Sequence, residues 1–196
     1  MALLNQRGKR PAWPGAVWLT LAGLALLCAD NLRAQRADPP LEAGVKAGYL
    51  FNFTKYTQWP AGAFTSGTAP IVIGVLGDDP FGEVLDQTVA KRTSQERKVV
   101  IRRARDVKAL LGCQTVFISR SEQARLPVIL AALRRTPVLT VCDVDEFFEQ
   151  GVMIKLSLVK ETVRFEVKLE PAERAGIKFG SGMLDAARRV WPKSGG

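Results

Sequence analysis

The sequence predicts a single-domain α/β fold, a sandwich in which helices flank a mixed β-sheet with a parallel centre and an antiparallel hairpin at one side. Short, continuously apolar segments alternate with helical segments, which is typical of a parallel sheet covered on both faces. Two later segments instead alternate apolar and charged residues, which indicates a hairpin with one face toward water. No repeat or internal boundary divides residues 35–196, so we expect one domain there.

The first 34 residues have the pattern of a signal peptide. A basic stretch at residues 7–10 precedes an uncharged apolar run of 14 residues at 16–29. A transmembrane helix needs about 20 such residues, so this run is short for a stable span. Small residues at Ala29 and Ala34 suit a cleavage site. We therefore expect export, with an uncleaved N-terminal anchor as the alternative.

Export lowers the charge of the chain without removing its basic character. Loss of residues 1–34 takes the formal net charge from +9 to +6. One local cluster of basic residues remains, at Lys98, Arg102, Arg103 and Arg105. An exported protein meets little nucleic acid, so this cluster fits an acidic protein or a membrane surface, unless it is simply a solvated face.

Two cysteines remain after export. Cys113 begins one predicted strand and Cys142 ends another. If those strands are parallel neighbours, the sulfurs lie at opposite ends, about 16 Å apart. A disulfide needs its Cα atoms within about 7 Å. We expect two free, buried thiols, or an intermolecular bridge if either is exposed.

An aromatic helix at residues 41–58 opens the domain, and Pro60 stops it because proline disfavours helical geometry in the preceding residue. The side chains at helical spacing, expected to face the core, are Val45, Tyr49, Phe53 and Tyr56. Phe51 and Lys55 then point away from that face. Gly44 and Gly48 predict close approach to a neighbouring element.

The other elements follow in order. Strands are expected at residues 71–76, 99–103, 115–119 and 138–142, with helical segments at 81–90, 106–111, 122–135 and 143–149. Ser121 is the expected cap of the third of these helical segments. The hairpin strands, at residues 154–158 and 163–169, meet at Lys160 and Glu161. A short helix at 171–175, a turn at 180–182 and a last helix at 183–190 close the chain.

The composition excludes several kinds of catalytic site. The chain has no histidine, which removes the usual general base and the commonest metal ligand. Histidine-dependent triads and the usual zinc sites are therefore excluded. Neither a P-loop nor a dinucleotide-binding glycine motif is present. The sequence predicts a protein that is not an enzyme and carries no cofactor.

A cleft at the carboxyl end of the strand at residues 71–76 is the best candidate ligand site, because open α/β sheets bind ligands at such ends. Its residues are Gly77, Asp78, Asp79 and Phe81. Paired acids suit magnesium, but the neighbouring strand ends in Ser119 where a receiver-like domain needs aspartate. Capping of a helix by Asp79 is the preferred interpretation. A metal-dependent hydrolase that also uses Asp143 and Asp145 is a further hypothesis.

Two surface features have both a structural and a functional interpretation. The glycine-serine-glycine turn at residues 180–182 can bind an anion or simply cap a helix through Ser181. The charged face of the hairpin can meet a partner or face water. The residues of that charged face are Lys155, Arg164, Glu166 and Lys168.

Several short motifs, in order, resemble one known family. They begin with Tyr49-Leu-Phe-Asn-Phe-Thr-Lys55 and Trp59-Pro60, and continue with Ile73-Gly-Val-Leu-Gly77 and Asp79-Pro-Phe-Gly82. Cys113-Gln114, Pro137-Val-Leu-Thr140, Gly151-Val-Met-Ile154 and Val163-Arg-Phe-Glu166 follow. This series, which spans nearly the whole exported chain, is similar to that of the YfiR family of exported bacterial proteins.

The resemblance implies a periplasmic regulator rather than an enzyme. The best understood members bind the periplasmic sensor domain of an inner-membrane diguanylate cyclase and lower cyclic-di-GMP signalling and biofilm formation, often as dimers. The residues we expect at a partner or dimer contact are Phe51, Lys55, Arg164, Glu166 and Lys168. Lys168 departs from the asparagine usual in the family, and both cysteines lack the nearby partners of disulfide-bonded members. A periplasmic small-molecule-binding module that signals to a membrane partner is the alternative.

Overall fold

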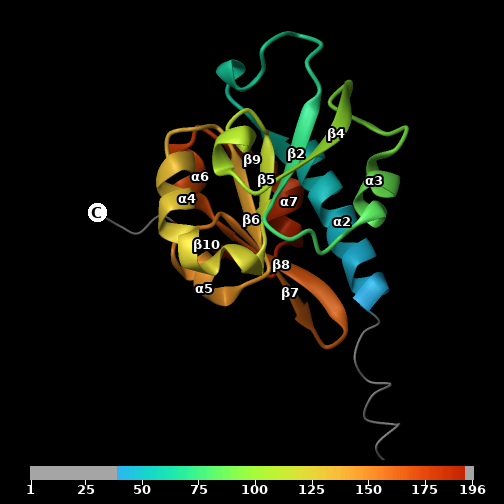
Figure 1. Cartoon of the computed structure of the whole chain (residues 1–196), viewed down its shortest axis with the longest axis vertical. Helices are drawn as coiled ribbons and strands as arrows, with labels where there is room; N and C mark the ends of the chain where they lie inside the picture. Colours follow the sequence, from blue (N-terminus) through green and yellow to red (C-terminus); the bar gives the residue numbers. More distant parts are fainter. Residues whose placement is uncertain (1–38, 193–196) are drawn as a thin grey trace, which may run out of the picture. The chain divides into compact units, whose positions relative to one another are not determined.

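The computed structural model describes residues 39–192, which form a mixed β-sheet with helices packed on both faces (Figure 1). The predicted signal peptide and its cleavage site lie outside these residues. The α/β sandwich predicted from the sequence is confirmed, with a parallel centre and an antiparallel hairpin toward one side.

The large sheet has the strand order β10-β8-β7-β6-β5-β2-β4-β3. Its strands are β2 (Ile71–Leu76), β3 (Thr93–Ser94), β4 (Arg97–Ala104), β5 (Thr115–Ile118), β6 (Leu139–Cys142), β7 (Ile154–Val159), β8 (Thr162–Lys168) and β10 (Arg189–Trp191). The strands from β4 to β7 run parallel, β7 and β8 form the antiparallel hairpin, and β3 pairs antiparallel with β4. A small separate sheet pairs β1 (Thr57–Gln58) with β9 (Lys178–Phe179).

Helices cover both faces of the large sheet. The α-helices are α2 (Pro39–Tyr56), α3 (Glu83–Val89), α4 (Leu126–Leu133), α5 (Asp145–Glu149), α6 (Leu169–Arg174) and α7 (Ser181–Ala186), and the 3₁₀ turns are η1 (Ala61–Ala63), η2 (Val107–Leu110) and η3 (Arg120–Arg125). Buried side chains of α2, α3, α6 and α7 join one apolar cluster. Those of α4, α5 and η2 join a second cluster.

The first helix buries more of its surface than its main periodicity predicts. Phe53 is buried as expected, but Val45 and Tyr56 are 40% and 49% exposed. Phe51, expected to point outward, is only 2% exposed and packs in a third cluster with Ile71. The helix therefore uses two adjoining faces, because side chains of β2, β4 and α3 surround it as well as the main core.

Proline and glycine shift several helix boundaries. The helix expected at residues 122–135 is instead a 3₁₀ turn followed by α4. Pro127 lies in the first turn of α4, where the backbone N–H that proline lacks would have no partner within the helix. Ser121 is not its cap, because the Ser121 hydroxyl accepts a hydrogen bond from the Asp78 amide. Gly82, with φ of +52°, delays the start of α3 to Glu83.

The end of the described chain also differs from expectation. The last helix ends at Ala186, and Arg189–Trp191 forms β10, a parallel edge strand beside β8. Residues 57 and 58, expected to be helical, form β1 instead. The hairpin turn is as predicted, since Lys160 and Glu161 both have positive φ, as a two-residue type I′ turn requires.

Candidate functional site

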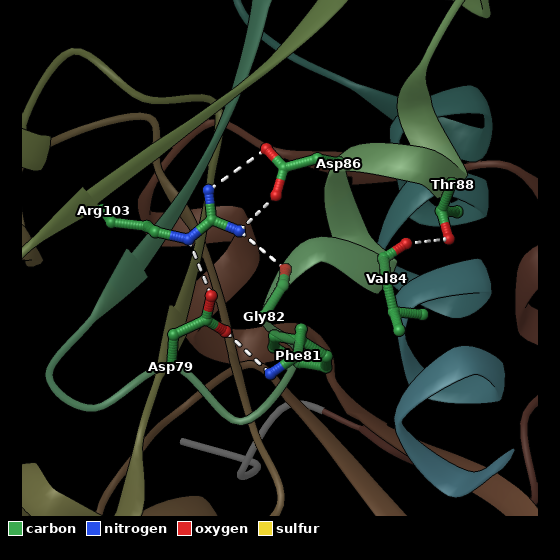
Figure 2. A network of polar contacts seen from close by, with 7 residues as sticks. All are labelled: Asp79, Phe81, Gly82, Val84, Asp86, Thr88 and Arg103. Atoms are coloured by element: carbon green, nitrogen blue, oxygen red, sulfur yellow. Dashed lines mark hydrogen bonds and ion pairs between the residues drawn. The ribbon is translucent and has the colours of Figure 1, made fainter. Parts of the chain in front are cut away.

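The cleft predicted at the end of β2 is a tight turn held by polar contacts (Figure 2). Oδ1 of Asp79 accepts a 2.7 Å hydrogen bond from the Phe81 amide and stabilises this turn. The prediction that Asp79 caps the helix is wrong, because α3 begins at Glu83 and its N-cap residue is Gly82. Phe81 is buried and packs edge-on against Phe117. Gly77 has φ of +89°, and a Cβ there would lie 2.7 Å from Glu122 Oε1. This turn has little room for a side chain at Gly77.

Arg103 ties this turn to β4 (Figure 2). Its guanidinium lies 2.7 Å from Asp79 Oδ2 and 2.6 Å from Asp86 Oδ2, and donates to the Gly82 carbonyl at 2.8 Å. The hydrogen bonds with Asp86 and Asp79 raise the pKa of Arg103, and the one with Arg103 lowers the pKa of Asp86. These contacts neutralise Asp79, one of the two acids of the predicted cleft.

All four aspartates of the metal-site hypothesis have basic partners. Asp78 pairs with Arg105 at 2.8 Å, and Asp79 with Arg103. Asp143 pairs with Lys46, and Asp145 with Lys155, each at 2.7 Å. Within residues 39–192, no group of three acidic or cysteine side chains is placed to hold a metal ion. The acids are used in ion pairs between elements.

The basic cluster predicted around β4 is therefore partly neutralised. Arg103 and Arg105 contact the aspartates described above. Arg102 donates to the Ala109 carbonyl at 3.3 Å, and Lys98 is exposed at the register position opposite Thr93. The cluster is a mixed-charge surface rather than a uniformly basic one.

The charged face of the hairpin is partly covered by other elements. Glu166, only 6% exposed, accepts a 3.0 Å hydrogen bond from Trp191 Nε1 and pairs with Lys155 at 3.2 Å. The ammonium group of Lys168 lies 4.6 Å from the centre of the Phe148 ring and donates to the Phe148 carbonyl at 2.5 Å. Arg164 alone of the predicted four is exposed. The face is covered by α5 and β10 because the chain adds a strand beyond β8.

Burial and pairing oppose each other in the ionisation of these groups. Burial is the largest influence on Glu166 and raises its pKa, but the bonds from Trp191 and Lys155 outweigh burial and leave the pKa lowered. For Lys155 the hydrogen bonds to Asp145 and Glu166 similarly outweigh burial, and its pKa is raised. For Lys168 burial prevails and lowers the pKa. A cavity of about 360 Å³ adjoins this group.

The remaining predicted site residues are separated by the fold. Phe51 is buried, so the prediction that it projects toward a partner is wrong. Lys55 is exposed, with its ammonium group 4.7 Å from the centre of the Phe51 ring. Gly180, not Ser181, precedes α7, and its amide donates to the Tyr56 carbonyl at 2.8 Å. That turn joins the end of the chain to α2.

Both cysteines are free and buried, as predicted. Burial raises the pKa of the Cys113 thiol to about 11 and that of Cys142 to about 12. Thiols in this state react slowly, because the thiolate is the reactive form.

Sequence reasoning missed two residues that the fold places at cavities. Trp191 covers Glu166, although it lies just beyond the last predicted helix, at residues 183–190, and was assigned to no element. Arg134 lines a cavity of about 420 Å³ between α4 and α6. Arg134 fell within the helix predicted at residues 122–135, and no local pattern indicated what lay beside it.

These features define a single-domain α/β protein with a mixed eight-stranded sheet. The chain belongs to the YfiR/HmsC-like family, whose sequence model matches residues 43–188. The resemblance noted in the sequence is thus confirmed. None of the described helices is long and apolar enough to cross a membrane.

The comparisons with individual solved structures give evidence about the fold only. No curated protein sequence matches the chain. A solved conserved domain protein from Vibrio cholerae aligns with 13% identity and a TM-score of 0.48, covering 61% of this chain and 54% of that one. The ABC domain from Streptococcus pneumoniae, solved in complex with L-Trp, aligns with 10% identity and a TM-score of 0.50, covering 74% and 60%. This chain thus spans roughly half to three-fifths of their lengths.

Proposed function

We propose that this protein is a periplasmic regulator that binds the periplasmic sensor domain of an inner-membrane diguanylate cyclase and lowers its output of cyclic-di-GMP. The observation that carries the proposal is the family match, which spans residues 43–188 and so nearly all of the described domain. The export signal predicted at residues 1–34 supports the same compartment.

The partner surface we propose lies where the start of α2 meets the β7–β8 hairpin (Figure 1). The Tyr49 hydroxyl donates to the Val163 carbonyl at 3.1 Å and joins the two elements. Apolar side chains are exposed on both, with Leu41 67%, Val45 40% and Leu158 42% exposed. The exposed turn residues Lys160 and Glu161 supply charges at its rim, whereas Arg164 faces the opposite side of the hairpin. Exposed apolar groups with a polar rim are typical of protein-binding surfaces.

Affinity capture from membranes tests this proposal. The full chain, tagged and expressed in its own cells, is expected to recover a membrane protein with a periplasmic sensor domain and a cyclase domain. The double variant Val45→Glu with Leu158→Glu should lose that protein and raise cellular cyclic-di-GMP. Val128→Glu is the matched control, because Val128 is 70% exposed on α4, away from the proposed surface.

Each outcome has a defined meaning. Recovery of no sensor-bearing membrane protein by the unaltered chain would contradict the proposal. If Val128→Glu loses the membrane protein to the same extent, the surface between α2 and the hairpin is not the specific binding site. A double variant that lowers the sedimentation coefficient, with the cyclase still recovered, would show that this surface joins two copies of the chain.

A further inference from the structure

The cavity between α4 and α6 shares only Pro171 with the cavity beside Lys168. It has a volume of about 420 Å³ and is bordered by α4, β6, the segment between α5 and β7, and α6. Figure 1 shows α4 and α6 as neighbouring helices. Cavities that bind small molecules commonly measure about 300–1,000 Å³ and are mostly apolar with a few polar groups. This cavity has the volume for such a ligand.

The lining favours an aliphatic group over a ring. Its apolar side chains are Pro127, Leu130, Ala131, Leu133, Met153 and Pro171. Among residues 39–192 no aromatic side chain lines it, so a flat ring would find no stacking partner within this part of the chain. The Thr140 hydroxyl also lines the cavity, but its oxygen already accepts a 3.0 Å hydrogen bond from the Met153 amide.

The charge at the cavity is positive. Arg134 and Arg174 line it, and no acidic residue of the described part of the chain does. Arg174 is paired with Glu170 at 3.0 Å. Arg134 makes no ion pair or hydrogen bond with residues 39–192, so its guanidinium is available to a ligand. A carboxylate matches the planar fork of a guanidinium with two parallel hydrogen bonds.

We propose that this cavity binds a medium-chain aliphatic carboxylate, with its alkyl chain against the leucine, methionine and proline side chains and its carboxylate on Arg134. The affinity rises with chain length by about three- to fourfold per buried methylene until the cavity is filled. This proposal does not depend on the proposed membrane partner, since the isolated protein binds the ligand.

Titration calorimetry with octanoate below its micelle concentration tests the site, on protein purified as the cells export it. The unaltered protein is expected to bind octanoate at least tenfold more tightly than octanol, which lacks the charge. Arg134→Ala should weaken octanoate binding about tenfold. Arg135→Ala is the matched control, because it follows the same helix and carries the same charge but does not line the cavity. Ala131→Phe, at an exposed lining position, should abolish binding by filling the cavity.

The proposal fails if octanoate and octanol bind equally, or if neither binds. Equal weakening by Arg134→Ala and Arg135→Ala would show a general charge effect and overturn the assigned anchor. Octanoate binding retained in a folded Ala131→Phe variant would place the ligand elsewhere. Each variant changes an exposed residue, and unchanged thermal unfolding of the free variant establishes that it is folded.

Discussion

The indole Nε1 of Trp191 donates a 3.0 Å hydrogen bond to Oε2 of Glu166, which fastens the edge strand β10 to the hairpin strand β8. The other carboxylate oxygen of Glu166 lies 3.2 Å from the Lys155 ammonium group. A buried carboxylate is stable only where such partners replace water. This contact thus connects the end of the described chain to the sheet through one charged group.

Glu166→Gln is expected to lower the free energy of unfolding at pH 7 by about 1–3 kcal/mol, because it removes a charged, buried hydrogen-bond acceptor. The pKa of Glu166 is lowered from its ordinary value of 4.5. The stabilisation by the Glu166 carboxylate is therefore fully present above pH 4.5. It is lost as the pH falls through the lower pKa that Glu166 has in the folded state.

Urea unfolding at pH 7 and at about pH 3 measures this effect. The difference between the unaltered protein and Glu166→Gln should shrink at the lower pH. Glu161→Gln, at the exposed hairpin turn, is the control and should show no difference at either pH. A Glu166→Gln deficit that persists unchanged at low pH would contradict an ionic origin.

Phe51→Ala should destabilise the fold by about 3–5 kcal/mol, as buried phenylalanine truncations do. Phe51→Glu should destabilise the fold at least as much, because it places a carboxylate among Ile71, Ile73 and Val89. The cations nearest to the ring, Lys55 and Arg92, offset only part of that cost. Circular dichroism and urea unfolding measure both effects. Asn52→Glu, on the exposed side of the same helix, is the control and should fold normally. A folded Phe51→Glu protein of near-normal stability would show that Phe51 lies at the surface and not in the core.

Arg103→Gln should destabilise the protein by about 1 kcal/mol, and Arg105→Gln by less than about 0.5 kcal/mol, since exposed ion pairs contribute little. Arg103 contacts two aspartates and a carbonyl, whereas Arg105 pairs only with the exposed Asp78. In an NMR titration, Arg103→Gln should also raise the pKa of Asp86 toward its ordinary 3.8. Equal destabilisation by the two variants would show that the contacts of Arg103 contribute no more to stability than the single ion pair of Arg105.

Local sequence patterns predicted the central strands well and the helix ends less well. Strand β2 begins and ends where its apolar run does, because a strand buried on both faces must be apolar at every position. The strand β10 was missed because its three residues are too few to show the alternating pattern of a strand. They form a strand only because β8 offers an open edge.

The candidate sites depended even more on distant contacts. The sequence placed Asp78 and Asp79 correctly just after β2. It did not show that Arg103 of β4 and Arg105, just after β4, would reach them. Likewise, the alternation of the hairpin identified Glu166 as facing away from the main core. It did not show that Trp191 would cover it.

The sequence by itself determined the fold class, the family, the central parallel strands, the hairpin and the separation of the two cysteines, since each follows from local periodicity, motif order or spacing. Tertiary structure decided which polar residues are available to a partner or ligand. It buried Phe51 and Glu166, neutralised the acids after β2 and left Arg134 at a cavity. The physical reason is that exposure and charge pairing depend on elements far apart in the chain, which no local pattern encodes.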